Sequence, residues 1–275
     1  MLRTRVITAV VLVLVVLAVL FLAPPALFSL FALLVVLLGC WEWSRMSGLR
    51  GTGQGVFLAA SGAIGAALWL IYIRDEPVFA RIAYGSLVVA AIFWVGVASV
   101  WLVQHLRPSP GFCAIAGWLV LWPTWVALVL LHQADVWLLL ALAILVWVSD
   151  VCAYFAGKAF GRHKLAPRIS PGKTWEGVAG ALLGVVVYGL VLAFGTRHAS
   201  IAEIFAPGAR LAAVAAMVGL AAFGIVGDLF ESWMKRGAGL KDSSALLPGH
   251  GGLLDRIDAL TSTLPLAALA LVVMR

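Results

Sequence analysis

The sequence predicts an all-helical polytopic membrane protein with about nine transmembrane helices and a cytoplasmic N-terminus. Of its 275 residues, 64% are hydrophobic and 11% are charged, whereas soluble domains are roughly 45–50% apolar and about 25% charged. A soluble globule of this composition would expose large apolar patches to water, and a disordered chain requires low hydrophobicity. The composition therefore excludes both of these classes.

Nine segments are apolar over most of the roughly 20 residues that a membrane-spanning helix needs. The strands of a barrel would instead alternate in polarity over about ten residues. Two connections are long, 156–174 and 230–258, and the chain divides into an N-terminal group of five spans, 1–132, and a C-terminal group, 133–275, within one membrane unit. The spans are expected near residues 6–22, 25–44, 55–73, 86–105, 113–131, 136–155, 175–194, 209–229 and 259–274.

The basic residues predict the orientation, because Lys and Arg collect in cytoplasmic connections. With the N-terminus inside, fourteen of the 19 basic residues, Arg3, Arg5 and Arg107 among them, fall on the cytoplasmic side, and the remainder, including Arg275, fall outside. Nine of the fourteen lie in the two long connections, so these connections are expected to face the cytoplasm and anionic partners. The first span is expected to remain uncleaved.

The three cysteines form neither a disulfide framework nor a zinc-binding spacing, because all lie in apolar segments. Glycines and alanines recur at helical spacing in two later spans, which is typical of closely packed membrane helices. The two sets are Gly177, Gly180 and Gly184, and Ala221, Gly224 and Gly227.

Asp150 and the connection after it suggest an anion-binding site. A carboxylate within a span is costly and is expected to face the interior of the bundle with a cationic or donor partner. Glycines and prolines in the connection allow the backbone to approach an anion, and the free amides of a helix beginning near Thr174 suit phosphate oxygens. The simpler alternative is that the cations only contact anionic lipid headgroups. No strand is expected before this helix. The candidate binding residues here are Asp150, Lys158, Lys164, Ser170, Lys173 and Thr174.

The region around 230–258 holds two pairs of carboxylates. Asp228 and Glu231 lie three residues apart on one helix face, and Asp255 and Asp258 are spaced in the same way where the last span begins. Carboxylates brought together at one membrane depth would repel each other unless a cation lies between them. Oxygen ligands favour Mg²⁺, Mn²⁺ or Ca²⁺. The alternative is a network of salt bridges with the neighbouring lysines and arginines.

A glycine-rich stretch, Pro248-Gly249-His250-Gly251-Gly252, separates these two pairs. Its exposed amides leave room for a phosphate or a nucleobase, and His250 could donate a hydrogen bond or a proton. There is no G-x-S-x-G nucleophile motif. Phosphoryl-type transfer fits this set, because it depends on positioning and charge neutralisation rather than on a protein nucleophile.

From Ser232 to Asp258 the sequence resembles the signature of phosphatidate cytidylyltransferases, also called CDP-diacylglycerol synthases. The stretch Ala153–Lys158 and the run Ile169–Gly177 are also similar to that family. The matching positions of the signature are Ser232, Lys235, Arg236, Lys241, Asp242, Pro248, His250, Gly251, Gly252, Asp255, Arg256 and Asp258.

The resemblance implies a membrane enzyme, expected as a homodimer, that makes CDP-diacylglycerol and diphosphate from CTP and phosphatidate in phospholipid biosynthesis. It implies Mg²⁺ held by Asp228 and Asp255, with Mn²⁺ as an alternative and room for a monovalent cation nearby. A CTP-dependent lipid kinase, a cytidylyltransferase for another lipid phosphate and a transporter are the competing functions, and no nucleic-acid partner is expected. The expected catalytic residues are Asp228, Lys235, Arg236, Lys241, Asp242, His250, Asp255, Arg256 and Asp258, and the further expected substrate-binding residues are Glu231, Ser232, Gly251 and Gly252.

Overall fold

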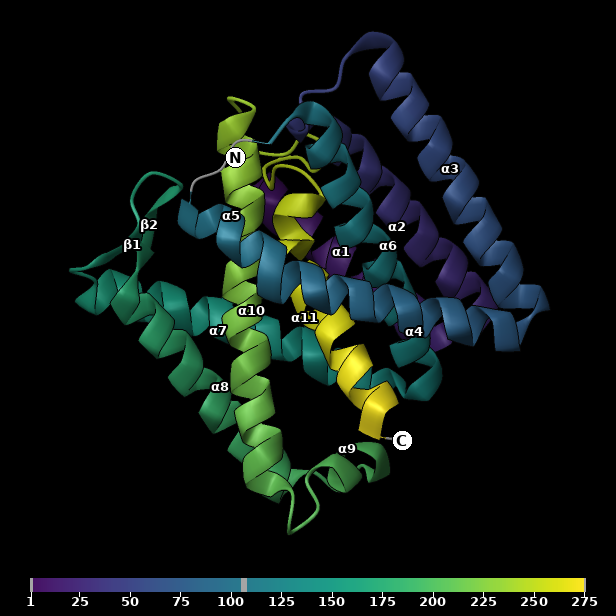
Figure 1. Ribbon diagram of the computed structural model, residues 1–275. Helices are drawn as coiled ribbons and strands as arrows, with labels where there is room; N and C mark the ends of the chain where they lie inside the picture. Colours follow the sequence, from purple (N-terminus) through teal and green to yellow (C-terminus); the bar gives the residue numbers. More distant parts are fainter. Residues whose placement is uncertain (1, 105–107, 275) are drawn as a thin grey trace.

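The computed structural model describes residues 2–104 and 108–274, and side chains from residue 7 onward within the first range (Figure 1). Arg107 and Arg275, and the side chains of Arg3 and Arg5, lie outside the described residues. The helices in chain order are α1 (Leu2–Leu22), α2 (Pro25–Met46), α3 (Gly51–Arg74), α4 (Glu76–Ile92), the π-helix η1 (Phe93–Ala98), α5 (Ser99–Gln104), α6 (Pro110–Ala134), α7 (Val136–Phe160), α8 (Trp175–Gly195), α9 (Ala199–Ile204), α10 (Arg210–Gly237) and α11 (Leu254–Met274).

Within the described residues, eight helical segments are long and apolar enough to cross a membrane, and a shorter apolar stretch, Ile7–Leu22, lies in α1. This confirms a helical protein with many spans. The fourth span, which α4, η1 and α5 form together, begins at Glu76 rather than near 86. The reason is local: the Asp75 side chain accepts a hydrogen bond from the Val78 amide and caps the helix, and a proline follows at the first turn.

The two helices that border the second long connection extend further than expected. α10 continues to Gly237 instead of ending near 229, and α11 begins at Leu254 instead of near 259. The polar residues at these ends remain helical because Lys235 pairs with a carboxylate one turn before it and with one from α11. The true connection is therefore residues 238–253.

The last helix joins the two groups of spans. α10 packs between α8 and α11, and α11 also contacts α4 and α6 of the N-terminal group (Figure 1). α7 packs along the length of α8, and α2 along α6. The expected close packing is confirmed: a Cβ at Gly180 would meet the Ala156 side chain on α7, and one at Gly227 would come within 2.6 Å of Ser262 Oγ on α11.

A short antiparallel hairpin lies between α7 and α8, where no strand was expected. Strand β1 (Lys164–Ala166) pairs with β2 (Ser170–Thr174), with Lys164 opposite Thr174. The Trp175 amide donates to the His163 carbonyl, and the buried Ile169 anchors the turn. The hairpin projects from the ends of α7 and α8 (Figure 1), and it leads directly into α8.

Aromatic rings fix the end of α10. Phe230 is almost fully buried, and its ring packs against Trp43 of α2, Phe93 and Trp94 of η1, and Trp101 of α5. Burying a large aromatic side chain contributes about 1.5–3 kcal/mol, so this cluster holds the turn that carries the polar residues on either side of Phe230. The π-helix, an element frequent at functional sites, presents two of these rings.

Candidate active site

A polar pocket of about 470 Å³ lies where α7, the hairpin, the start of α8 and α10 meet. Here the first long connection, which forms the hairpin, contacts α10. Six of the expected site residues line the pocket: Asp150, Lys158, Ser170, Lys173, Thr174 and Asp228.

An ion pair joins the hairpin to α10 across this pocket. Lys173 Nζ on β2 lies 2.5 Å from Asp228 Oδ2 on α10. Ser232 Oγ donates weakly, at 3.4 Å, to the other oxygen of Asp228. Asp150 on α7 lies within electrostatic range of both Asp228 and Lys173. Lys173 is therefore a cation near Asp150, although its ion pair is with Asp228.

The start of α8 closes one side of the pocket. Thr174 caps the helix, because its side-chain oxygen accepts a hydrogen bond from the Gly177 amide at 3.1 Å. Gly157 and Gly177 lie where α7 and α8 cross, and a Cβ on Gly177 would come within 3.0 Å of the Ala153 carbonyl oxygen. These glycines bring the two helices close enough to place the amides of the first turn beside the pocket.

A second polar group lies between α10 and α11. Lys235 Nζ contacts Glu231 at 3.2 Å and Asp255 Oδ1 at 2.5 Å, and all three side chains are at least nine-tenths buried. The other oxygen of Asp255 accepts hydrogen bonds from the Gly252 amide at 2.8 Å and from the Ser243 amide at 3.0 Å. Asp255 therefore binds the 238–253 connection as well as Lys235.

The carboxylates of the two helices lie near one another. Asp258 is within electrostatic range of Asp228, Glu231 and Lys173. Apart from the contact with Lys235, the Glu231 oxygens accept no hydrogen bond from the described residues. These carboxylates outnumber the two lysines, Lys173 and Lys235, that contact them and offer oxygen ligands, which suits a hard cation such as Mg²⁺. Within the described residues, however, no three His, Cys, Asp or Glu side chains already form a metal-binding geometry.

Other expected site residues lie around these two groups without joining them. Arg236 donates to the Ile169 and Leu240 carbonyls, at 3.4 and 3.1 Å, and so ties the hairpin turn to the end of α10. His250 Nδ1 is buried without a partner among the described residues. Among the expected site residues that do not line the pocket, the exposed ones are Lys164, Arg236, Lys241, Asp242 and Arg256.

The two glycines expected to bind substrate have tight surroundings. Gly251 has φ of 81°, in the region that favours glycine, and a Cβ there would lie 2.8 Å from Asp255 Oδ2. A Cβ on Gly252 would collide with Ser243 Oγ and would lie 2.5 Å from Glu42 Oε1. Both positions therefore require glycine for packing, whether or not a substrate approaches their amides.

Glu42 is the polar residue that the sequence analysis missed. It lies in α2, is fully buried, and contacts the 238–253 connection and the start of α11. One observation could have revealed it: a carboxylate inside a span is costly and is expected to have a specific partner. Asp150 and Glu42 are both carboxylates within spans, so both are expected to have such a partner.

Fold and site together define a polytopic membrane protein with a pocket, lined by charged side chains, near one end of its helices. The model of the cytidylyltransferase family matches residues 3–274. A phosphatidate cytidylyltransferase of Pseudomonas aeruginosa is 42% identical, covering 98% of this chain and 96% of the relative. Proteins of the same name from Haemophilus influenzae and Brucella suis are each 36% identical over at least 95% of this chain. The chain belongs to the cytidylyltransferase family.

Proposed function

We propose that the chain is a phosphatidate cytidylyltransferase, which makes CDP-diacylglycerol and diphosphate from CTP and phosphatidate. The nearly full-length similarity to relatives of that name supports this activity. The observation that carries the assignment to a site is the Lys173–Asp228 pair, which joins the hairpin to α10 beside a polar pocket among apolar helices. A lipid phosphate and a nucleotide need such a polar site at the edge of the membrane.

The reaction requires no protein nucleophile. An oxygen of the phosphatidate phosphate attacks the α-phosphorus of CTP in line, the bond from the α-phosphorus to the bridging oxygen breaks, and diphosphate leaves with the electron pair. A phosphate monoester has a second pKa of about 6, so the attacking oxygen is already anionic near neutral pH. A general base is therefore not required, and the protein contributes positioning and charge neutralisation.

Cations from both connections supply that neutralisation. Lys173 at the pocket and Lys235 at the second group are fixed by carboxylates, whereas Lys241 is exposed and free to meet a phosphate. Lys158 lies at the pocket with its Nζ 5.7 Å from the centre of the Tyr154 ring. We propose that these four lysines bind the phosphate oxygens of CTP and phosphatidate and offset the charge that develops on diphosphate.

We propose that Mg²⁺ binds to Asp228 and Asp255, with Asp258 as a further oxygen donor. The ion would supply charge neutralisation on the triphosphate, and Mg²⁺ commonly keeps substrate phosphates and water among its ligands. Lys173 and Lys235 already contact oxygens of Asp228 and Asp255, so the ion would compete with these two lysines. Asp258 contacts neither lysine directly, which leaves its carboxylate more open to a cation.

We also propose that the pocket end of the helices faces the cytoplasm in the inner membrane of a bacterium and that the protein forms a homodimer. The bacterial relatives support the membrane. The excess of basic residues in the two connections at the pocket supports the orientation. CTP is then available on the side on which the pocket lies.

The proposal is tested with purified protein, phosphatidate, Mg²⁺ and CTP labelled at either the α- or the γ-phosphorus. We expect the α-label to enter the lipid phase and the γ-label to leave as diphosphate. Transfer of the γ-label to lipid would establish a lipid kinase instead. The assay is repeated with a different lipid phosphate in place of phosphatidate. Transfer of the α-label to that lipid alone would establish a different acceptor, and no transfer to either lipid would contradict the proposed activity.

A further inference from the structure

A buried carboxylate from the N-terminal spans binds the connection that carries the second polar group. Glu42 Oε1 accepts hydrogen bonds from Ser244 Oγ at 2.5 Å and from the Leu253 amide at 2.9 Å. Glu42 Oε2 accepts from Ser243 Oγ at 3.0 Å and from the Leu254 amide at 2.7 Å. Four donors thus converge on one side chain that has no solvent exposure.

These hydrogen bonds fix the middle and the C-terminal end of the 238–253 connection. The two amides belong to the residues at the start of α11, where helix N–H groups have no partner within the helix, so Glu42 caps α11 from a different helix. The two hydroxyls belong to the middle of the connection. One turn after Glu42, Arg45 donates from Nη1 to the Ser243 carbonyl at 3.3 Å, which gives α2 a second contact with the same segment.

Ser243 connects Glu42 to Asp255. Its hydroxyl oxygen lies 3.0 Å from Glu42 Oε2 and 3.1 Å from Asp255 Oδ2. A hydroxyl has one proton to donate, so the two carboxylates share it, while the Ser243 amide donates only to Asp255. A shift of Ser243 away from Glu42 would therefore also move a donor of Asp255.

We propose that Glu42 is a positioning residue, which sets the place of Asp255 by holding the 238–253 connection and the first turn of α11. This inference rests on the function proposed above, because it assigns Asp255 a role in the reaction. It also assigns a role to the N-terminal spans, which carry no residue of the polar pocket. Glu42 itself is enclosed and does not touch substrate.

Glu42→Gln is the most informative variant. The amide has nearly the volume of the carboxylate, but its NH₂ group donates and cannot accept. Each carboxylate oxygen of Glu42 faces one backbone amide, from Leu253 or from Leu254. In either orientation of the glutamine, one of these N–H groups would face another donor and lose its partner. The variant thus breaks the contact without creating a cavity.

The experiment compares the full-length wild type, Glu42→Gln and Ser29→Ala in detergent. Ser29 is the matched control, because it is also fully buried in α2 and its hydroxyl bonds to the Ala26 carbonyl rather than to the connection. Amide hydrogen exchange is measured across the chain, and the Mg²⁺ concentration for half-maximal activity is measured per folded protein. We expect Glu42→Gln to accelerate exchange at least tenfold in residues 241–254 and to raise that Mg²⁺ concentration at least tenfold. Ser29→Ala should change neither.

The proposal would be overturned if residues 241–254 of Glu42→Gln exchange their amide hydrogens at the wild-type rate. It would also be overturned if the Mg²⁺ concentration for half-maximal activity is unchanged. If Glu42→Gln exchanges rapidly throughout the chain, Ser244→Ala replaces it, since this variant removes only one of the four donors. We then expect about threefold effects on both quantities, and wild-type behaviour would overturn the proposal. An inactive wild type would instead contradict the proposed function, and the exchange measurement would still decide whether Glu42 holds the connection.

Discussion

At the scale of single residues, Lys235 compensates the negative charge of the buried carboxylates between α10 and α11. It contacts both Glu231 and Asp255, and each of the three side chains is at least nine-tenths buried. Removing one partner of a buried ion pair costs about 3–5 kcal/mol, because the remaining charge has lost its compensation. Lys235 thus has a structural role in addition to the proposed contact with phosphate.

Lys235→Met should lower the free energy of unfolding by about 3 kcal/mol. Adding Glu231→Gln should recover part of this loss, because it removes one of the two carboxylates left without a cation. Denaturant-induced unfolding in detergent micelles measures both effects. The control is Lys241→Met, at an exposed position, which should change stability by less than about 0.5 kcal/mol. If the two substitutions change the free energy of unfolding additively, Lys235 does not compensate the charge of Glu231.

At the scale of elements, the pocket depends on how closely α7 and α8 approach. A Cβ at Gly180 would collide with the Ala156 side chain and lie 3.0 Å from the Cys152 carbonyl oxygen. That carbonyl is part of the backbone of α7 and cannot rotate away. The same pair of helices carries Asp150 at the pocket and Thr174 at its edge, so a change in their separation alters the pocket.

Gly180→Ala should therefore destabilise the protein by about 1–3 kcal/mol, the usual cost of overpacking, and should lower activity. Gly219→Ala is the matched substitution, since a Cβ at Gly219 meets nothing within 4 Å. It should be neutral or stabilising by up to about 1 kcal/mol, because alanine favours helix more than glycine does. Thermal unfolding of the two variants provides the comparison, and equal midpoints would contradict close packing at Gly180.

The elements also show what the sequence could predict. Most spans are predictable because each is apolar over its whole length. This pattern can be recognised without knowing which helices pack against the span. The ends of α10 and α11 lie closer in the chain than the sequence predicts. The carboxylate pairs Asp228 and Glu231, and Asp255 and Asp258, are expected at the cytoplasmic ends of the two spans, whereas the pairing of Lys235 with Asp255 keeps the residues beyond them helical. The hairpin was missed since Ser-Pro-Gly-Lys-Thr lacks the β-branched, alternating pattern of a strand.

At the scale of the whole molecule, the site is assembled from segments far apart in the chain. The motifs predicted that residues near 150–174 and 228–258 act together, and the Lys173–Asp228 contact confirms that they meet. The contacts of Glu42 could not be predicted in this way, because its partners lie about 200 residues later. Only the packing of α11 against the N-terminal spans brings these residues together.

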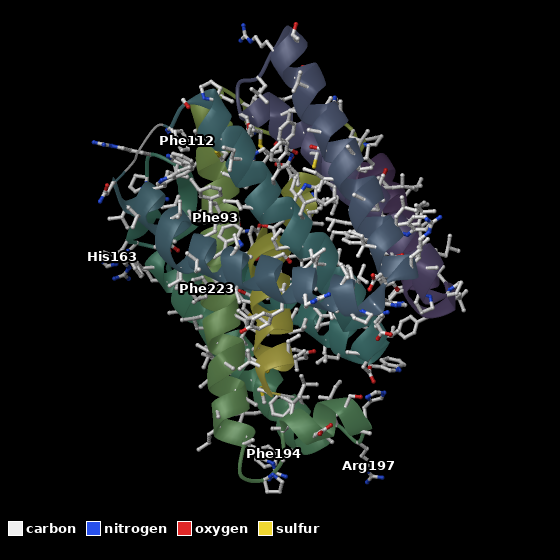
Figure 2. The ribbon with its side chains drawn as sticks, turned by 45° about the vertical axis from the view of Figure 1, so that its right-hand side comes forward. Phe93, Phe112, His163, Phe194, Arg197 and Phe223 are labelled. Atoms are coloured by element: carbon white, nitrogen blue, oxygen red, sulfur yellow. The ribbon has the colours of Figure 1, made fainter. Side chains whose placement is uncertain are left out.

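The proposed orientation gives a direct prediction for labelling. Lys164 on the hairpin and Arg197 after α8 lie at opposite ends of a helix that is about 31 Å long at 1.5 Å per residue. Figure 2 shows Arg197 beside Phe194 and well separated from His163, the neighbour of Lys164. The test places a cysteine at either position in a chain whose Cys40, Cys113 and Cys152 are replaced by alanine.

A membrane-impermeant maleimide added to intact cells, with the outer membrane permeabilised, should label Arg197→Cys and leave Lys164→Cys unlabelled. In inverted membrane vesicles the pattern should reverse, because the hairpin is expected to face the cytoplasm. Labelling of Lys164→Cys from outside would contradict the proposed orientation.

The most direct test of the central claim measures α-labelled CMP transferred to phosphatidate by the wild type, Asp228→Asn and Asp75→Asn. Asp75 is the control carboxylate, because it caps α4 away from the pocket and asparagine caps a helix equally well. We predict full transfer by the wild type and Asp75→Asn, and less than about a tenth by Asp228→Asn, a barrier increase of at least about 1.4 kcal/mol. If Asp228→Asn is folded in the membrane and transfers more than this, the result would contradict the claim that Asp228 binds the Mg²⁺ needed for transfer.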